Sequence, residues 1–170
     1  MIETPRLILD KAKPGDWEDM YLNVWSRPES ARYMFWSLTT DAAEAPDRMR
    51  RTIEFQKTHD SYLIYLRSSG RAIGFAGVTK LSETVYEESG VCLGPEYTGR
   101  GLGTEVLRAL LDHCRELGAR EFRCQAREDN EASNRLIRSL GFRLVSTALT
   151  TDSRDGSQCT LLQYSLRLDS

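Results

Sequence analysis

The most informative part of this sequence is residues 91–104, which read Val91-Cys92-Leu93-Gly94-Pro95-Glu96-Tyr97-Thr98-Gly99-Arg100-Gly101-Leu102-Gly103-Thr104. The apolar start has the pattern of a strand, and it runs into a loop with glycine at three alternate positions. From Leu102 onward, apolar residues recur at helical spacing, and Gly118 ends the pattern. The stretch therefore predicts a strand, a glycine loop and an amphipathic helix in direct succession.

Gly99, Gly101 and Gly103 allow backbone N–H groups to approach a ligand closely. The first turn of the following helix adds unpaired N–H donors and a partial positive charge, which together suit a pyrophosphate group. A P-loop fits poorly because Arg100 and Gly101 replace its lysine and hydroxyl residue, and Thr104 replaces the third glycine of a dinucleotide fingerprint. Taken alone, the stretch also fits a turn that merely starts a helix.

The rest of the chain divides into strands and helices around this segment. Apolar patterning predicts strands at 6–11, 62–66, 72–80, 87–93, 122–126, 143–149 and 160–168. Helices are expected from an N-cap at Asp16 up to Pro28, from Ala42 or Pro46 to Thr58, from Leu102 to Leu117, and over 130–140. The expected fold class is α+β, with a mixed, largely antiparallel twisted sheet of about seven strands and four helices in one domain, 1–170.

Composition narrows the function classes. Of 170 residues, 40% are hydrophobic and 28% charged, and the formal net charge of −2 comes without a clustered basic face, so no nucleic-acid partner is expected. The chain shows no signal-peptide pattern and no apolar run of membrane-spanning length, so we expect a cytoplasmic protein with no membrane contact. Its four cysteines and two histidines have no metal-ligand spacing, so no metal is expected.

A second segment reads Asn130-Glu131-Ala132-Ser133-Asn134-Arg135-Leu136-Ile137-Arg138-Ser139-Leu140-Gly141-Phe142. Together with Arg100-Gly101-Leu102-Gly103 it resembles two motifs of the GCN5-related N-acetyltransferase (GNAT) superfamily: the end of the coenzyme A signature Q/R-x-x-G-x-G/A, and a downstream Asn…Ser…Gly-Phe motif. Residues 3–9 are similar to the opening strand of the ribosomal-protein (RimJ/RimL-like) branch. The resemblance covers essentially the whole chain and implies acetyl transfer from acetyl-CoA to a primary amine.

The resemblance implies a site between two parallel strands that splay apart, 87–93 and 122–126. The pantetheine arm would lie in this gap, and a backbone N–H near Leu93 would bind the acetyl oxygen. The motifs imply these cofactor-binding residues: Cys92, Leu93, Thr98, Gly99, Arg100, Gly101, Leu102, Gly103, Thr104, Asn130, Ser133, Asn134 and Arg138. Two positions depart from the family pattern: Thr98 replaces the usual Gln or Arg, and Ile137 replaces a tyrosine that protonates the thiolate in many members.

Acetyl transfer requires a group that accepts the proton of the amine. Glu88 is the candidate, because it aligns with the strand glutamate that acts as base in histone-acetylating members. A period of two places Glu88, Gly90 and Cys92 on one face and Glu87 on the other, so Glu87 and water are the alternatives, or both carboxylates are merely solvated. Ser133 is the candidate hydrogen-bond donor to the thiolate, and the alternative is a serine that stabilises the helix terminus.

The aromatic stretch over residues 25–36 is the candidate acceptor site, with Trp25, Tyr33, Phe35 and Trp36 as the expected contacts. Residues 151–158 would form the opposite wall, whereas the alternative reading packs the rings beneath the first helix. The expected acceptor is a protein N-terminus or a small amine such as an antibiotic. The chain would act as a monomer or homodimer, and a non-catalytic acyl-CoA-binding module is the alternative from a different class.

Overall fold

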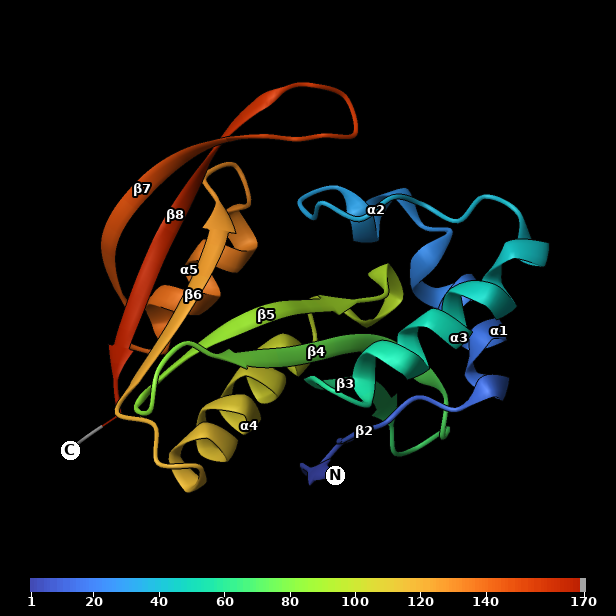
Figure 1. The fold of residues 1–170 in the computed structure, drawn as a ribbon, viewed down its shortest axis with the longest axis horizontal. Coiled ribbons are helices and arrows are strands. Elements are labelled where there is room, and N and C mark those ends of the chain that lie inside the picture. Colours follow the sequence, from blue (N-terminus) through green and yellow to red (C-terminus); the bar gives the residue numbers. More distant parts are fainter. Residues whose placement is uncertain (169–170) are drawn as a thin grey trace.

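The computed structural model describes residues 1–168 and contains an open eight-stranded sheet (Figure 1). The strands are β1 (Ile2–Glu3), β2 (Leu7–Asp10), β3 (Asp60–Leu66), β4 (Ala72–Lys80), β5 (Val85–Leu93), β6 (Glu121–Arg127), β7 (Arg143–Thr151) and β8 (Gln158–Arg167). Their order is β1-β2-β3-β4-β5-β6-β8-β7, and only the β5–β6 pair is parallel among the described strands. The α+β class is confirmed. The additional strand is β1, which is too short to show a period in the sequence.

Five α-helices connect or cover these strands. They are α1 (Trp17–Met20), α2 (Pro28–Ala31), α3 (Ala45–Gln56), α4 (Leu102–Glu116) and α5 (Glu131–Ser139). The expected first helix is α1 continued by a π-helical turn, Tyr21–Trp25, but Asp16 makes no side-chain cap to it. The unexpected helix is α2, which begins at Pro28. Proline suits the first helical position because an N–H there would have no intrahelical acceptor, so its absence costs nothing. Within residues 1–168, no helix is long and apolar enough to cross a lipid bilayer.

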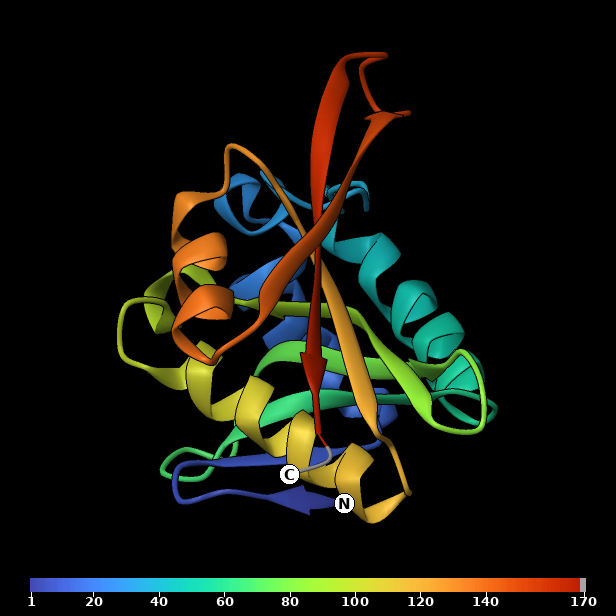
Figure 2. The ribbon, with the colours of Figure 1, turned by 90° about the vertical axis from the view of Figure 1, so that its left-hand side faces the viewer.

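Helices cover both faces of the sheet (Figure 2). On one face, α4 buries Val106 and Leu110 against Ile64 of β3 and Phe122 of β6. On the other, α1 and α3 bury a cluster that includes Leu63, the next residue of β3. Since successive strand residues point to opposite faces, one apolar strand can serve both clusters.

The parallel pair β5–β6 is short and splayed. Its register joins Val85 to Glu121, Tyr86 to Phe122 and Glu87 to Arg123, and the pairing ends there. Beyond this point β6 continues along β8, and Figure 1 shows β5 and β6 diverging. The predicted splayed pair is therefore confirmed, and its divergence positions the site described below.

A β-bulge in β5 changes the predicted facing of its residues. Gly77 pairs with Gly90 while Val78 pairs with Glu88, which leaves Ser89 as an extra residue. Gly90 accommodates the bulge with a φ of 144°, a conformation that side-chain-bearing residues rarely adopt. The predicted common face of Glu88 and Cys92 is therefore wrong, because a strict period of two does not survive the bulge.

Candidate functional site

A cleft of about 410 Å³ opens between the diverging ends of β5 and β6. Its walls also include the glycine loop and the first turns of α4 and α5. Nine of the predicted catalytic and cofactor-binding residues line it: Glu88, Leu93, Thr98, Gly99, Gly101, Gly103, Thr104, Asn130 and Ser133. The fold thus brings both sequence motifs and the candidate base to one space.

Two glycines of the loop adopt left-handed backbone conformations. Gly99 and Gly101 adopt positive φ angles of 73° and 79°, and Gly101 is the N-cap residue of α4. An L side chain at either position would strain the backbone. The first N–H groups of α4 lack intrahelical acceptors, so this end of the helix can bind an anionic group in the cleft.

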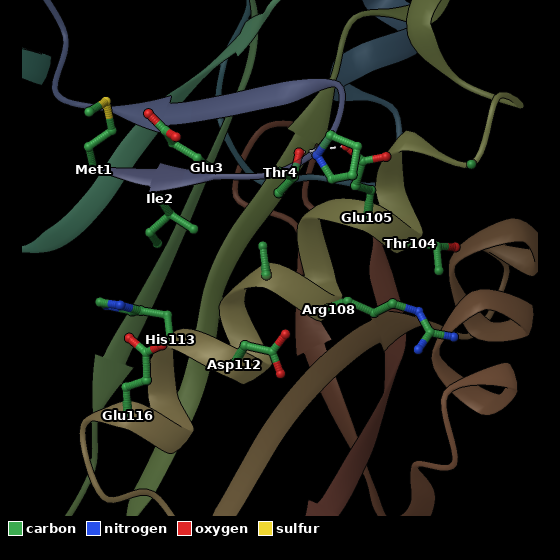
Figure 3. A pocket seen from close by; sticks show the side chains of 13 residues that line it. Met1, Ile2, Glu3, Thr4, Thr104, Glu105, Arg108, Asp112, His113 and Glu116 are labelled. Carbon is green, nitrogen blue, oxygen red and sulfur yellow. Dashed lines mark hydrogen bonds between the residues drawn. The ribbon is translucent and has the colours of Figure 1, made fainter.

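The N-terminal hairpin supports this loop from outside the cleft. Arg6 donates from Nη1 to the carbonyl oxygen of Arg100 (2.9 Å) and from Nε to Glu105 Oε1 (2.8 Å). The other oxygen of Glu105 accepts hydrogen bonds from the Thr4 hydroxyl (2.5 Å) and the Arg6 N–H (3.0 Å). Figure 3 shows Thr4 beside Glu105 on the outer face of α4. Motif reasoning missed this contact, although Thr4 and Arg6 belong to the opening segment that resembles the family.

The first turn of α5 forms the wall opposite the loop. Asn130 is the N-cap residue, and its Oδ1 accepts a hydrogen bond from the Ser133 N–H at 3.2 Å. Both residues also line the cleft, so the capping role and a ligand-binding role are compatible. Of the two, Ser133 carries the hydroxyl that can donate to a thiolate.

Three predicted cofactor contacts have side chains that serve other roles. Cys92 is 6% exposed and packs in the cluster on the opposite face, where its thiol contacts the Ser30 carbonyl. Leu102 is buried in the main core. Asn134 is 5% exposed and fully engaged, since its amide donates to backbone carbonyls and its Oδ1 accepts from the Tyr164 hydroxyl at 2.7 Å. These three side chains are therefore engaged elsewhere, and the cofactor contact expected of each residue stays a prediction for its backbone groups.

Arg100 and Arg138 also lie outside the lining of the cleft. The Arg100 guanidinium lies 5.7 Å from the centre of the Tyr97 ring. The Arg138 guanidinium lies over the Tyr164 ring at 5.9 Å. These positions follow from loop and helix geometry that a motif does not encode, and the cofactor contacts of both arginines stay predictions.

Backbone alternation directs one N–H donor of β5 toward the cleft. The Gly94 N–H donates to the Ile73 carbonyl of β4 (2.8 Å), and a Cβ added at Gly74 of β4 would lie 2.1 Å from the Cys92 oxygen. Cys92 and Gly94 therefore direct their backbone groups toward β4. Since adjacent residues of a strand alternate, the Leu93 N–H points away from β4, toward the gap.

Glu88 has an unusual electrostatic environment. Burial raises the pKa of its carboxyl to about 7, with a further contribution from the nearby charge of Glu87, while the Val91 N–H acts in the opposite direction. Glu87 lies in a separate pocket with Arg123 and Gln163. A cleft carboxyl with a pKa near neutrality is suited to accepting a proton.

Of the predicted acceptor contacts, only Tyr33 lines the cleft, where Met34 joins it. Trp25 is 3% exposed in the second cluster, and the Arg48 guanidinium lies 4.7 Å from its ring centre and 5.1 Å from that of Trp36. Phe35 is 42% exposed and outside the cleft lining. None of these three residues lines the cleft, and both tryptophans pack in or against the second cluster, so their acceptor contacts stay predictions.

No group of three or more His, Cys, Asp or Glu residues within 1–168 is placed to hold a metal ion. The four cysteines are buried and unpaired. The groups of this cleft that can donate or accept hydrogen bonds or protons include the Glu88 carboxyl and the Ser133 hydroxyl.

Comparisons with known proteins agree with this architecture. Residues 6–143 match the family model of the acetyltransferase (GNAT) domain. The chain is 38% identical over 95 residues to the N-alpha-acetyltransferase RimI of Mycobacterium tuberculosis. This match covers 54% of this chain and 58% of that protein. A Mycobacterium leprae protein is 35% identical over 91 residues, and the match covers 51% of this chain and 24% of that protein.

Solved structures of low sequence identity share the fold. A Salmonella typhimurium acetyl transferase that modifies the N-terminal serine of ribosomal protein L7/L12 superposes with a TM-score of 0.78 at 20% identity, covering 98% of this chain and 97% of that one. YncA of the same organism, solved with acetyl-CoA, superposes with a TM-score of 0.70 at 21% identity. The match covers 96% of this chain and 95% of that one. Because the family model spans most of the chain, this protein belongs to the GNAT family of acetyltransferases.

Proposed function

We propose that this protein transfers an acetyl group from acetyl-CoA to a primary amine. The observation that carries the proposal is the cleft itself, because it unites the glycine loop, the first turn of α5 and the Glu88 carboxyl between two splayed strands. Each of these supplies a function that acyl transfer needs: an anion site, a hydroxyl donor and a proton acceptor.

The residues divide the reaction as follows. The loop from Thr98 to Gly103 and the start of α4 bind the pyrophosphate. The Leu93 N–H binds the thioester oxygen, on which negative charge develops as the amine nitrogen attacks. Glu88 takes the proton that the amine loses, directly or through a water molecule. The carbon–sulfur bond then breaks, and Ser133 donates a hydrogen bond to the departing thiolate.

For the acceptor we propose a protein N-terminal α-amine. Two relatives support it, since one is named an N-alpha-acetyltransferase and another is described as modifying an N-terminal serine. An α-amine with a pKa near 8 also loses its proton far more readily than a lysine with a pKa near 10.4, which suits a base that titrates near neutrality. A small amine is the rival acceptor, and a non-catalytic acyl-CoA-binding module is the rival function.

Thiol release from acetyl-CoA with a panel of amines tests these proposals. The panel contains peptides with free N-termini, the same peptides with blocked N-termini and a lysine side chain, and small amines. We expect release with free N-termini and none with blocked ones. Thiol release only with small amines would overturn the proposal of an N-terminal acceptor. Tight acetyl-CoA binding without thiol release for any amine would favour the binding module.

Acetyl-CoA is expected to stabilise the fold, because a ligand that binds only the native state shifts the unfolding equilibrium. At a concentration near 100 times the dissociation constant, the free energy of unfolding should rise by about 2.7 kcal/mol. Thermal melts with and without acetyl-CoA measure the effect. A melting temperature unmoved by millimolar acetyl-CoA would contradict the proposed site.

Arg6→Met is expected to weaken acetyl-CoA binding about tenfold, because it removes the hydrogen bond to the Arg100 carbonyl and the charged contact with Glu105. Calorimetry of acetyl-CoA binding measures the change. Arg67→Met is the matched control, since Arg67 supports the same hairpin through a hydrogen bond to the Thr4 carbonyl (2.7 Å) rather than to the loop. Equal losses in both variants would show that hairpin stability, not loop support, matters.

A further inference from the structure

The tip of the β7–β8 hairpin contacts the segment that carries one wall of the cleft. Arg154, at this tip, donates from Nη1 to the carbonyl oxygens of Ala31 (2.8 Å) and Trp36 (3.1 Å). These carbonyls bracket Tyr33 and Met34, which line the cleft. Figure 1 shows the hairpin reaching across toward α2. One guanidinium thus ties both ends of the short segment that positions Tyr33 and Met34.

Asp152 fixes the direction in which Arg154 points. Its carboxylate accepts hydrogen bonds from Arg154 Nε (2.9 Å) and Nη2 (2.7 Å), and also from the Arg154 backbone N–H (3.0 Å). The hydrogen bonds from Arg154 lower the pKa of Asp152 to about 2, so this residue, which is 3% exposed, stays ionised at neutral pH. Such a bidentate pair restricts the guanidinium to one orientation.

The same carboxylate reaches the opposite wall of the cleft. Arg127, at the end of β6, lies with its Nη1 3.4 Å from Asp152 Oδ2, and its side chain is 13% exposed. Arg127 also lines the cleft. We call Arg127, Asp152 and Arg154 the Asp152 network. It joins three segments that are far apart in the sequence: the end of β6, the hairpin tip and residues 31–36.

We propose that the Asp152 network positions the Tyr33–Met34 wall and thereby sets how tightly and selectively the cleft binds the amine acceptor. The inference rests on the proposed acetyl transfer. Asp152 and Arg154 are positioning residues, because neither lines the cleft and both act through Tyr33 and Met34. The glycine loop and its Arg6–Glu105 support lie outside the network, so loosening the wall should change acceptor binding and leave acetyl-CoA binding intact.

Arg154→Met tests the role of the guanidinium, because methionine keeps an apolar side chain but donates no hydrogen bond. We expect the acceptor KM to rise about tenfold while the acetyl-CoA dissociation constant stays within about twofold. Bulkier amines should gain in kcat/KM relative to small ones, because the wall can then move. Arg154→Lys should restore part of the acceptor affinity, since a lysine can still pair with Asp152 but cannot reproduce the planar fork.

Arg143→Met is the matched control, because Arg143 is an exposed arginine at the base of the same hairpin and should leave both constants unchanged. Hydrogen exchange without substrate supplies a readout independent of activity. Amides of residues 31–36 should exchange faster in Arg154→Met than in the wild type, and melting curves verify that the variants are folded.

Three results would overturn the inference: unchanged exchange in residues 31–36, an unchanged acceptor KM and selectivity, or an acceptor KM and acetyl-CoA dissociation constant that rise together. If the wild type acetylates no amine, the proposed function fails. In that case hydrogen exchange of residues 31–36 still decides whether Arg154 positions the Tyr33–Met34 wall.

Discussion

Gly101→Val is expected to weaken acetyl-CoA binding by at least about 100-fold, which corresponds to about 2.7 kcal/mol. Gly101 is the N-cap residue of α4 with a φ of 79°, where a β-branched residue is strongly disfavoured. The backbone would have to leave the conformation that directs the first N–H groups of α4 into the cleft. Several charge-assisted hydrogen bonds to the pyrophosphate would be lost together, each contributing about 1.5–3 kcal/mol. Calorimetry measures the loss.

Gly118→Val provides the matched control at the other end of the same helix. Gly118 has a φ of 94° and no atoms within 4 Å of an added Cβ, so the substitution imposes a comparable backbone strain outside the cleft. We expect both variants to melt earlier than the wild type, and only Gly101→Val to lose acetyl-CoA binding. Unchanged acetyl-CoA affinity in Gly101→Val would remove the loop from the site.

The local patterns of the sequence predict local structure well. Helix α4 begins at the predicted Leu102, because the glycine loop ends there and the helical spacing of apolar residues starts there. Strand β4 has its predicted bounds, since a turn signal limits one end and polar residues the other. The two motifs likewise place most of the cleft lining, because the fold brings the start of α4 and the start of α5 together.

Features that depend on contacts distant in the sequence could not be predicted in the same way. The extra residue Ser89 is visible only when β5 is paired with β4, so a strict period of two predicts the wrong face for Cys92 relative to Glu88. Trp25 and Tyr33 belong to one aromatic segment, yet tertiary packing buries the first and leaves the second at the cleft. The contact of Arg154 with Ala31 spans more than a hundred residues, and no local period encodes it.

Glu88→Gln is expected to lower kcat by about 10²–10⁴-fold at neutral pH, because glutamine cannot accept the proton of the amine. Glu88 lines the cleft together with Val91 and Leu93. Steady-state kinetics with one N-terminal peptide measure the change. Acetyl-CoA affinity should change little, since the glycine loop is intact.

The pH profile gives the sign of the effect. Burial raises the pKa of Glu88 to about 7, so the wild-type kcat/KM should rise as the pH increases through about 7 and the carboxylate forms. Glu88→Gln should lose this rise in kcat/KM near neutral pH, and its activity should recover at high pH, where free amine is abundant. Glu87→Gln should instead move the step to lower pH with a near-normal maximum, because removing a neighbouring negative charge favours the ionised form of Glu88.

Stability measurements separate a lost base from a lost fold. A carboxyl whose folded pKa exceeds its unfolded value stabilises the native state below the unfolded pKa, and this contribution is lost as the pH rises through the folded pKa. For Glu88 that window runs from 4.5 to about 7 and corresponds to at most about 3 kcal/mol. Glu88→Gln should therefore melt later than the wild type at pH 8 and similarly at pH 4. A more stable but inactive variant would identify Glu88 as the base, whereas wild-type activity at neutral pH would assign the proton to water.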